Sequence, residues 1–130
     1  MTDRAAPANA RLAALNSLHR GQVLAASMPS SRVGCRGWVG VYPLTNRRET
    51  LSLLRRKGQP IPLPAVRVYR IRQFEVDRTL IERGISIGEP ELENQADLVV
   101  FGDEELIEKL LLLGMSIDQL ELPYKSDYPI

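Results

Sequence analysis

The only cysteine of the chain lies in a loop that also carries arginines. Residues 29–37 read PSSRVGCRG, so Cys35 precedes Arg36 and follows Arg32 by three positions. Neighbouring cations lower the pKa of a thiol and favour the nucleophilic thiolate. Because His19 is the only histidine, a Cys–His dyad would need it as the base. The same two residues are also explained as a loop cysteine and a surface histidine that take part in no reaction. Cys35 and His19 are therefore the candidates for one alternative, a small cysteine-dependent enzyme, and no complete catalytic set is present.

A second group of residues has the side chains that bind phosphate. Segment 47–57 is rich in arginine, and more arginines follow in the strand predicted after it. Such a group neutralises several phosphates and gives binding that weakens as salt rises. Tyr42 and Tyr69 are the main aromatic side chains available for base stacking. A nucleic-acid-binding protein is thus a further alternative, with these residues at its surface: Arg47, Arg48, Arg55, Arg56, Lys57, Arg67, Arg70 and Arg72.

The net charge of +1 conceals two halves of opposite charge. Up to Arg72 there are thirteen Lys or Arg and two acids, whereas from Gln73 onward there are four Lys or Arg and fourteen acids. Either the two sets neutralise each other within one fold, or one of them faces a charged partner. A surface of one sign steers association and rejects wrong partners.

The second interpretation predicts a protein-binding module more readily than an enzyme. An acidic C-terminal half could cover a basic site on another protein, which is how immunity proteins and antitoxins act. In such an interface, acids steer the encounter and aromatic anchors supply most of the binding energy. The predicted contact surface consists of Glu89, Glu91, Glu93, Asp97, Glu104, Glu105, Glu108, Tyr124, Asp127 and Tyr128.

Several other classes of protein are disfavoured by composition. One cysteine and one histidine give neither a disulfide framework nor a cysteine-built zinc site, so we expect no metal and no cofactor. No run approaches the roughly twenty apolar residues that span a bilayer, and residues 1–10 lack the apolar region of a signal peptide. We therefore expect a cytoplasmic protein without a membrane partner. The oligomeric state does not follow from the sequence.

The segment from Asp97 to Gly114 gives the clearest signal for local structure. The apolar run from Leu98 to Phe101 is typical of a strand that is covered on both faces. Asp103 then has the type and position of a helix N-cap, and leucines at helical spacing continue as far as Leu113. A strand, a turn and a helix are expected here, and the strand needs a sheet around it.

The remaining elements alternate along the chain. Helices are predicted after Asn9, over 47–57 and after Asp77; strands are predicted over 38–42 and 66–71, the latter at an edge or with a bulge. Isoleucines at 85 and 87 suggest a brief strand, and prolines at 60, 62 and 64 exclude a central one. The fold class is α/β or α+β, a small single-layer sheet of about four strands with helices packed on it. We expect one domain over 1–130, with residues 1–8 frayed and an extended tail over 122–130.

Overall fold

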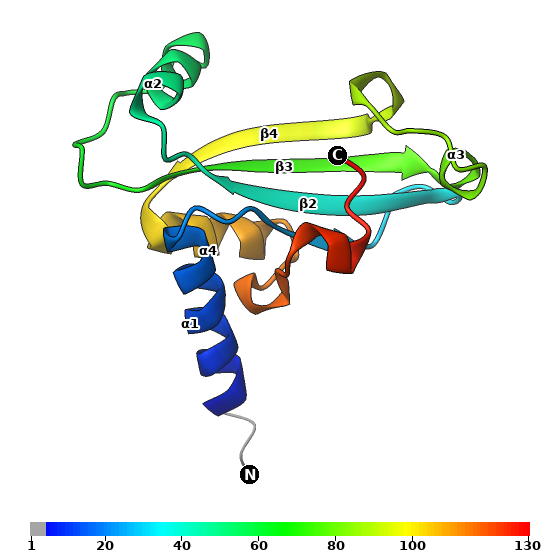
Figure 1. The fold of residues 1–130 in the computed structure, drawn as a ribbon, viewed down its shortest axis with the longest axis horizontal. Helices are drawn as coiled ribbons and strands as arrows, with labels where there is room; N and C mark the ends of the chain where they lie inside the picture. Colours follow the sequence, from blue (N-terminus) through cyan, green and yellow to red (C-terminus); the bar gives the residue numbers. More distant parts are fainter. Residues whose placement is uncertain (1–4) are drawn as a thin grey trace.

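A four-stranded antiparallel sheet forms the centre of the protein (Figure 1). The computed structural model describes the backbone of residues 5–130 and the side chains from residue 9 onward. The strands lie in the order in which they occur in the sequence, β1-β2-β3-β4. Their bounds are β1 Leu24–Met28, β2 Cys35–Pro43, β3 Val68–Asp77 and β4 Glu93–Phe101. The predicted α+β class with four strands and helices packed on them is confirmed.

Two helices, α1 (Ala5–His19) and α4 (Gly102–Leu112), lie on the same face of the sheet (Figure 1). Side chains alternate between the two faces of a strand, so one set of alternate residues meets these helices. The main core fills the layer between them and contains Leu18, Val39, Val41, Tyr69, Ile71, Val100, Leu106 and Leu110, among others. We call this the covered face.

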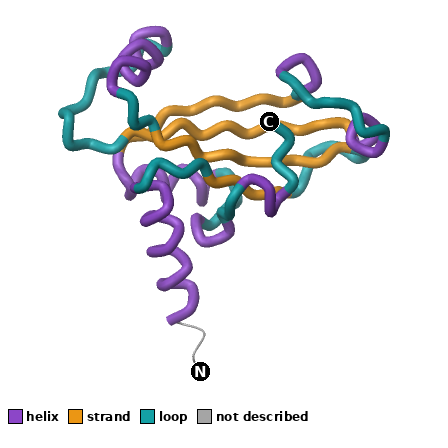
Figure 2. The backbone as a smooth tube through the Cα atoms, viewed as in Figure 1, coloured by secondary structure: helices purple, strands orange, loops and turns teal. Residues whose placement is uncertain are grey.

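Within residues 5–130, no helix lies across the middle of the opposite face of the sheet, as Figure 2 shows. A smaller apolar cluster of Trp38, Phe74, Val76 and Leu92 occupies one part of it. The helix α2 (Arg47–Arg56) lies beyond one end of the sheet, and the short helix α3 (Arg78–Glu82) lies at the other end (Figure 1). We call this the uncovered face.

The C-terminal segment wraps around the outer edge of β1. Ile117 is buried in the main core on the covered face, whereas Tyr128 packs against the apolar cluster on the uncovered face. Between them, Glu121 and Ala25 exchange two backbone hydrogen bonds of 2.8 and 2.9 Å. Within the described chain, the outer edge of β4 pairs with no strand. The outer edge of β1 is thus paired at Ala25, whereas the outer edge of β4 is open within the described chain.

Four local predictions are corrected by the structure. The first helix begins at Ala5, so Asn9 lies inside it and is not its cap. Of the segment 1–8 that was predicted to fray, residues 5–8 are helical and residues 1–4 lie outside the described residues. The tail forms a 3-10 turn over Pro123–Ser126 and is not fully extended. No strand forms at residues 85 and 87. Asp103 is not the cap of α4, because the helix begins at Gly102 and Asp103 lies in its first turn, where its carboxylate accepts a hydrogen bond from the Tyr69 hydroxyl at 2.6 Å.

The structure also decides where two of the predicted strands lie in the sheet. The strand over 66–71 was expected at an edge or with a bulge: β3 is not at an edge, since it lies between β2 and β4, but its register against β4 does shift between Gln73 and Glu75. The apolar run that ends at Phe101 was expected to be covered on both faces, but β4 is an edge strand and several of its side chains are partly exposed. Strand order is set by contacts distant in sequence, which local composition does not encode.

Candidate functional site

The ion pairs of this protein connect its two oppositely charged halves. Every ion pair of Lys or Arg among residues 9–130 joins a cation from the basic half to an acid from the later half. The pairs are Arg32–Glu93, Arg36–Asp127, Lys57–Asp97, Arg70–Asp97 and Arg72–Glu89. For these residues, the two sets of charge neutralise each other within the fold.

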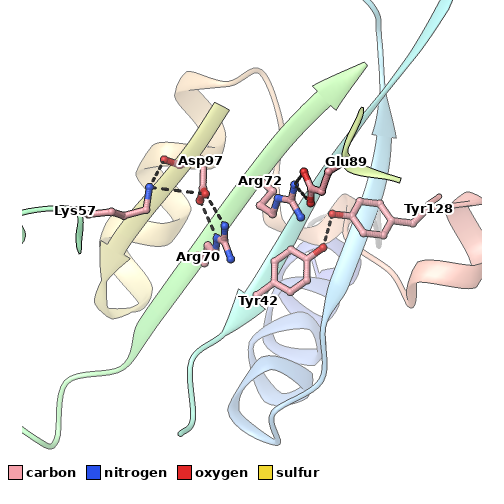
Figure 3. Close-up of polar contacts among 7 residues, drawn as sticks. All are labelled: Tyr42, Lys57, Arg70, Arg72, Glu89, Asp97 and Tyr128. Atoms are coloured by element: carbon pink, nitrogen blue, oxygen red, sulfur yellow. Dashed lines mark hydrogen bonds and ion pairs between the residues drawn. The ribbon is translucent and has the colours of Figure 1, made fainter. Parts of the chain in front are cut away.

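Three of these pairs lie together on the uncovered face of the sheet, beside a pair of tyrosines (Figure 3). Strand register places Arg70 beside Tyr42 and Arg72 beside Asp97. Because these positions share one parity along their strands, their side chains emerge on the same face. We call this group the face cluster: Tyr42, Lys57, Arg70, Arg72, Glu89, Asp97 and Tyr128.

Asp97 is the acidic centre of the face cluster. The Arg70 guanidinium donates to both carboxylate oxygens, with Nε 2.8 Å from Oδ1 and Nη2 2.6 Å from Oδ2. Lys57 Nζ donates to the backbone carbonyl of Asp97 at 3.0 Å and lies 3.7 Å from its carboxylate. The hydrogen bonds from Arg70 hold the pKa of the Asp97 carboxyl below its ordinary value. Both strands and the end of α2 are thus fixed relative to one another.

The other side of the face cluster consists of an aromatic pair and a second ion pair. The hydroxyl oxygens of Tyr42 and Tyr128 are 2.6 Å apart, and Arg72 Nη2 lies 2.8 and 3.0 Å from the carboxylate oxygens of Glu89. Burial raises the pKa of the Tyr128 phenol, so it stays protonated at neutral pH. A Cβ atom at Gly40 would lie 2.3 Å from the Tyr128 hydroxyl oxygen. Glycine at position 40 therefore leaves the space on the sheet that the Tyr128 ring occupies.

An open notch of about 350 Å³ separates the sheet from α2 next to Arg70. Leu53 and Thr50 of α2 form one wall, and the turn at Pro43 forms another. Arg56 and Arg70 contribute the cations at its rim. Depressions of this kind can take an anchor side chain of a binding partner, and the notch adjoins the face cluster through Arg70.

Cys35 and His19 are not brought together. Cys35 begins β2 opposite Asp77, whereas His19 binds the Asp103 carboxylate at 2.8 Å, beyond the other end of the sheet. The rise per residue along β3 separates these ends by about 30 Å. Burial raises the pKa of the Cys35 thiol, which opposes formation of a thiolate. The geometry gives the cysteine-enzyme alternative no support.

The acidic residues predicted to form one partner surface lie in separate parts of the fold. Glu89 and Asp97 belong to the face cluster, Glu93 pairs with Arg32, and Asp127 lies 4.0 Å from Arg36. The carboxylate of Glu91 accepts from the backbone N–H of Gly88. On α4, at the covered side, lie Glu104, Glu105 and Glu108, whereas Tyr124 is exposed in the tail and Tyr128 joins the face cluster. The structure therefore does not gather this set into one patch.

The basic residues predicted for nucleic-acid binding fall into two groups. Lys57, Arg70 and Arg72 are paired with acids in the face cluster. The others are exposed and form no ion pair within the described residues: Arg47, Arg48, Arg55 and Arg56 on α2, and Arg67 before β3. Of the two tyrosines considered for base stacking, Tyr69 is buried, and Tyr42 is half-buried with its hydroxyl hydrogen-bonded to that of Tyr128.

No family model matches the chain, and no curated protein or solved structure is significantly similar to it. The geometry of its own surfaces must therefore carry the functional argument. Across the described residues, no three His, Cys, Asp or Glu side chains are grouped so that they could hold a metal ion. No helix in the part of the chain that the structure describes is long and apolar enough to cross a membrane.

The face cluster as a unit was missed by the sequence interpretation. Its acids and its bases were assigned to two competing surfaces because they come from different halves of the chain. One usable signal was present: Arg70 and Arg72 alternate along a strand, and so do Gly40 and Tyr42. Alternation predicts a shared face within each strand, but only the register of the strands shows that the faces coincide.

Proposed function

We propose that this chain is a small protein-binding module whose contact surface is the uncovered face of the sheet, including the face cluster and the notch beside α2. Its function would be of the immunity-protein or antitoxin type, in which binding blocks a site on the partner. A cytoplasmic location belongs to the same proposal. The observation that carries it is the face cluster itself, an array of tyrosine, arginine and carboxylate side chains on the uncovered face of the sheet (Figure 3).

The types of residue in the face cluster and the fixed conformations of their side chains both support this choice of surface. Tyrosine and arginine are enriched among the residues that dominate binding energy in protein interfaces. Arg70, Arg72 and Tyr42 are each held by a partner within the chain. Because these side chains are already ordered, binding loses less conformational entropy than it would with mobile ones. Such a surface suits tight recognition by a rigid module.

The charge balance of the face cluster determines which chemical groups we expect on the partner. Three cations and two carboxylates make the face cluster close to neutral. We therefore expect a partner with mixed polar and aromatic groups opposite this face. The unpaired acids of α4 lie elsewhere and would contribute only long-range steering.

The proposal can be tested by removing the face cluster without leaving a charge unpaired. The first variant is Tyr42→Ala; the second combines Arg72→Ala with Glu89→Ala, so that both members of an ion pair are lost together. The matched control combines Arg11→Ala with Glu108→Ala, which removes one exposed charge of each sign from the helices of the covered side. Tagged chains are used to recover partners from the native cell, and recovered proteins are quantified by mass spectrometry.

We expect one protein to be retained by the natural chain and by the control but lost from both face variants. Removing a dominant contact weakens affinity by about thirtyfold or more. Purified partner and titration calorimetry then measure the loss directly. A partner that binds the face variants as tightly as the natural chain would contradict the proposal, and so would the absence of any specifically retained protein.

A further inference from the structure

The helix α2 concentrates positive charge that the rest of the fold leaves unneutralised. Segment 44–67 contains six Lys or Arg and a single acid, Glu49. Lys57 is paired with Asp97, but the four arginines of the helix form no ion pair among the described residues. By contrast, the arginines of β2 and β3, Arg36, Arg70 and Arg72, each have an acidic partner.

The arginines of α2 point away from the protein. Thr50, Leu53 and Leu54 form the buried side of the helix. A helix turns by about 100° per residue, so Arg48 and Arg55 lie on the opposite side, two turns and about 10.5 Å apart. Arg47 and Arg56 flank this stripe, and all four side chains are exposed. Because α2 lies beyond the end of the sheet, the stripe is open to a long ligand (Figure 1).

Two of these arginines occupy positions that are unfavourable for the isolated helix. Arg47 and Arg48 are in the first turn, where the helix dipole is positive and cations are destabilising. No acid of the described chain offsets them by an ion pair. An external anion along this side would interact favourably with both the side chains and the dipole.

We propose that the outward side of α2, formed by Arg47, Arg48, Arg55 and Arg56, binds the phosphate backbone of a nucleic acid without reading its bases. Arginine matches phosphate geometry through paired N–H donors. A strand of nucleic acid supplies repeated anions at the spacing of a few ångströms that a stripe two turns long can follow. The helix has no aromatic residue to stack on bases. Arg56 also lies at the rim of the notch, but Arg48 and Arg55 belong neither to the notch nor to the face cluster. Substituting these two therefore tests the inference independently of the protein-binding surface.

The test measures fluorescence anisotropy of labelled 20-nucleotide single-stranded DNA and 20-base-pair duplex DNA at 50 and 200 mM NaCl. Four phosphate contacts predict an affinity loss of roughly a hundredfold over this range on duplex. The test variant combines Arg48→Glu with Arg55→Glu. The control combines Arg11→Glu with Arg20→Glu, which makes the same change of charge at an exposed position of α1 and at the exposed residue that follows it. We expect the test variant to weaken binding at least tenfold and to reduce the salt slope by about 2, and the control to retain the slope.

Thermal unfolding of the single variants separates loss of binding from loss of folding. Arg48→Glu puts an anion in the first turn and should raise the Tm by about 1–4 °C, whereas Arg55→Glu puts one in the last turn and should lower it. Both should nevertheless bind DNA less tightly. Equal weakening in test and control variants, no binding at 50 mM NaCl, or binding of phosphatidylglycerol vesicles in place of DNA would overturn the proposal.

Discussion

Glu75 is a buried carboxylate that fastens the loop before β2 to the sheet. It lies in β3 where the register against β4 shifts. Its oxygens accept hydrogen bonds from the Ser30 hydroxyl, from the Ser31 backbone and hydroxyl, and from the Asn94 side-chain amide. These donors lower the pKa of the Glu75 carboxyl to about 2, although burial opposes the change. The residue is therefore charged throughout the physiological range.

We expect Glu75→Gln to reduce the free energy of unfolding at pH 7 by about 1–3 kcal/mol. Whichever way the new amide is turned, its NH₂ group faces either the backbone N–H of Ser31 or the amide of Asn94, both donors. Because the folded pKa is depressed, the advantage of the natural chain is complete above the ordinary pKa of 4.5 and is lost as the pH falls towards 2. Urea unfolding at pH 7 and at pH 3 measures both effects.

The exposed Glu82 of α3 provides the control for this substitution. Glu82→Gln removes the same charge from a site without buried donors, and its stability should stay within about 0.5 kcal/mol of the natural value. If Glu75→Gln and Glu82→Gln behaved alike at both pH values, the network around Glu75 would not stabilise the fold.

At the scale of elements, the C-terminal tail acts as a clamp on β1 and β2. Its 3-10 turn places the carbonyl of Ser126 at 2.8 Å from Nε1 of Trp38, and Tyr128 then packs against Phe74 with ring centroids 5.4 Å apart. Trp38 is only 1% exposed and is the single tryptophan of the chain. Its fluorescence therefore reports whether the tail is in place.

We expect deletion of residues 123–130 to shift the Trp38 emission to longer wavelength and to increase its quenching by acrylamide. The indole loses its hydrogen-bond acceptor and part of its apolar cover, so water reaches it. Far-UV circular dichroism should retain most of its signal, because α1, α4 and β1–β4 end before the deleted segment.

Ser126→Ala is the matched control for the deletion. The acceptor for Trp38 is the backbone carbonyl of Ser126, which the substitution keeps. Its Trp38 emission should equal that of the natural chain. An unchanged emission in the deletion variant would show that the tail does not cover Trp38 in solution.

The elements themselves were more predictable than their arrangement. The helix over 47–57 was predicted, and the Asn46 side chain does cap it by accepting from the Glu49 backbone N–H at 3.1 Å. Caps and apolar periodicity act within a few residues, so a single sequence carries them. The last strand was recognised only from Leu98 onward, whereas β4 begins at Glu93, because the polar side chains at its start match an exposed edge and not a core. The edge position of β4 depends on distant partners and could not be predicted.

At the scale of the whole molecule, the ion pairs of Lys and Arg link the two oppositely charged halves. Two interpretations of the charge asymmetry were open, neutralisation within the fold and a free charged pole. The ion pairs support the first for four acids of the later half, Glu89, Glu93, Asp97 and Asp127, whereas α2 retains a basic surface. The sequence alone could not decide between these two interpretations, because partners such as Arg32 and Glu93 lie far apart along the chain.

We expect the stability of the whole fold to fall as salt is raised. Sodium chloride screens exposed ion pairs, each of which contributes about 0.2–1 kcal/mol. Between 20 and 500 mM NaCl the free energy of unfolding should decrease by about 1–2 kcal/mol in total. Urea unfolding followed by Trp38 fluorescence provides the measurement.

A variant that combines Arg72→Gln with Glu89→Gln removes one well-formed pair and leaves the net charge unchanged. Its dependence on salt should be weaker than that of the natural chain. Stability that is flat or increases with salt in both proteins would mean that these pairs contribute nothing measurable.

The unequal edges of the sheet limit how copies of this chain could aggregate. The backbone of Glu121 already occupies the rim of β1 at Ala25, whereas β4 keeps an unpaired row of donors and acceptors in the described chain. Two molecules that paired through their β4 edges would leave no fully unpaired sheet edge on either molecule. A filament needs two free edges on every unit, so it could not grow until the C-terminal segment detached from β1.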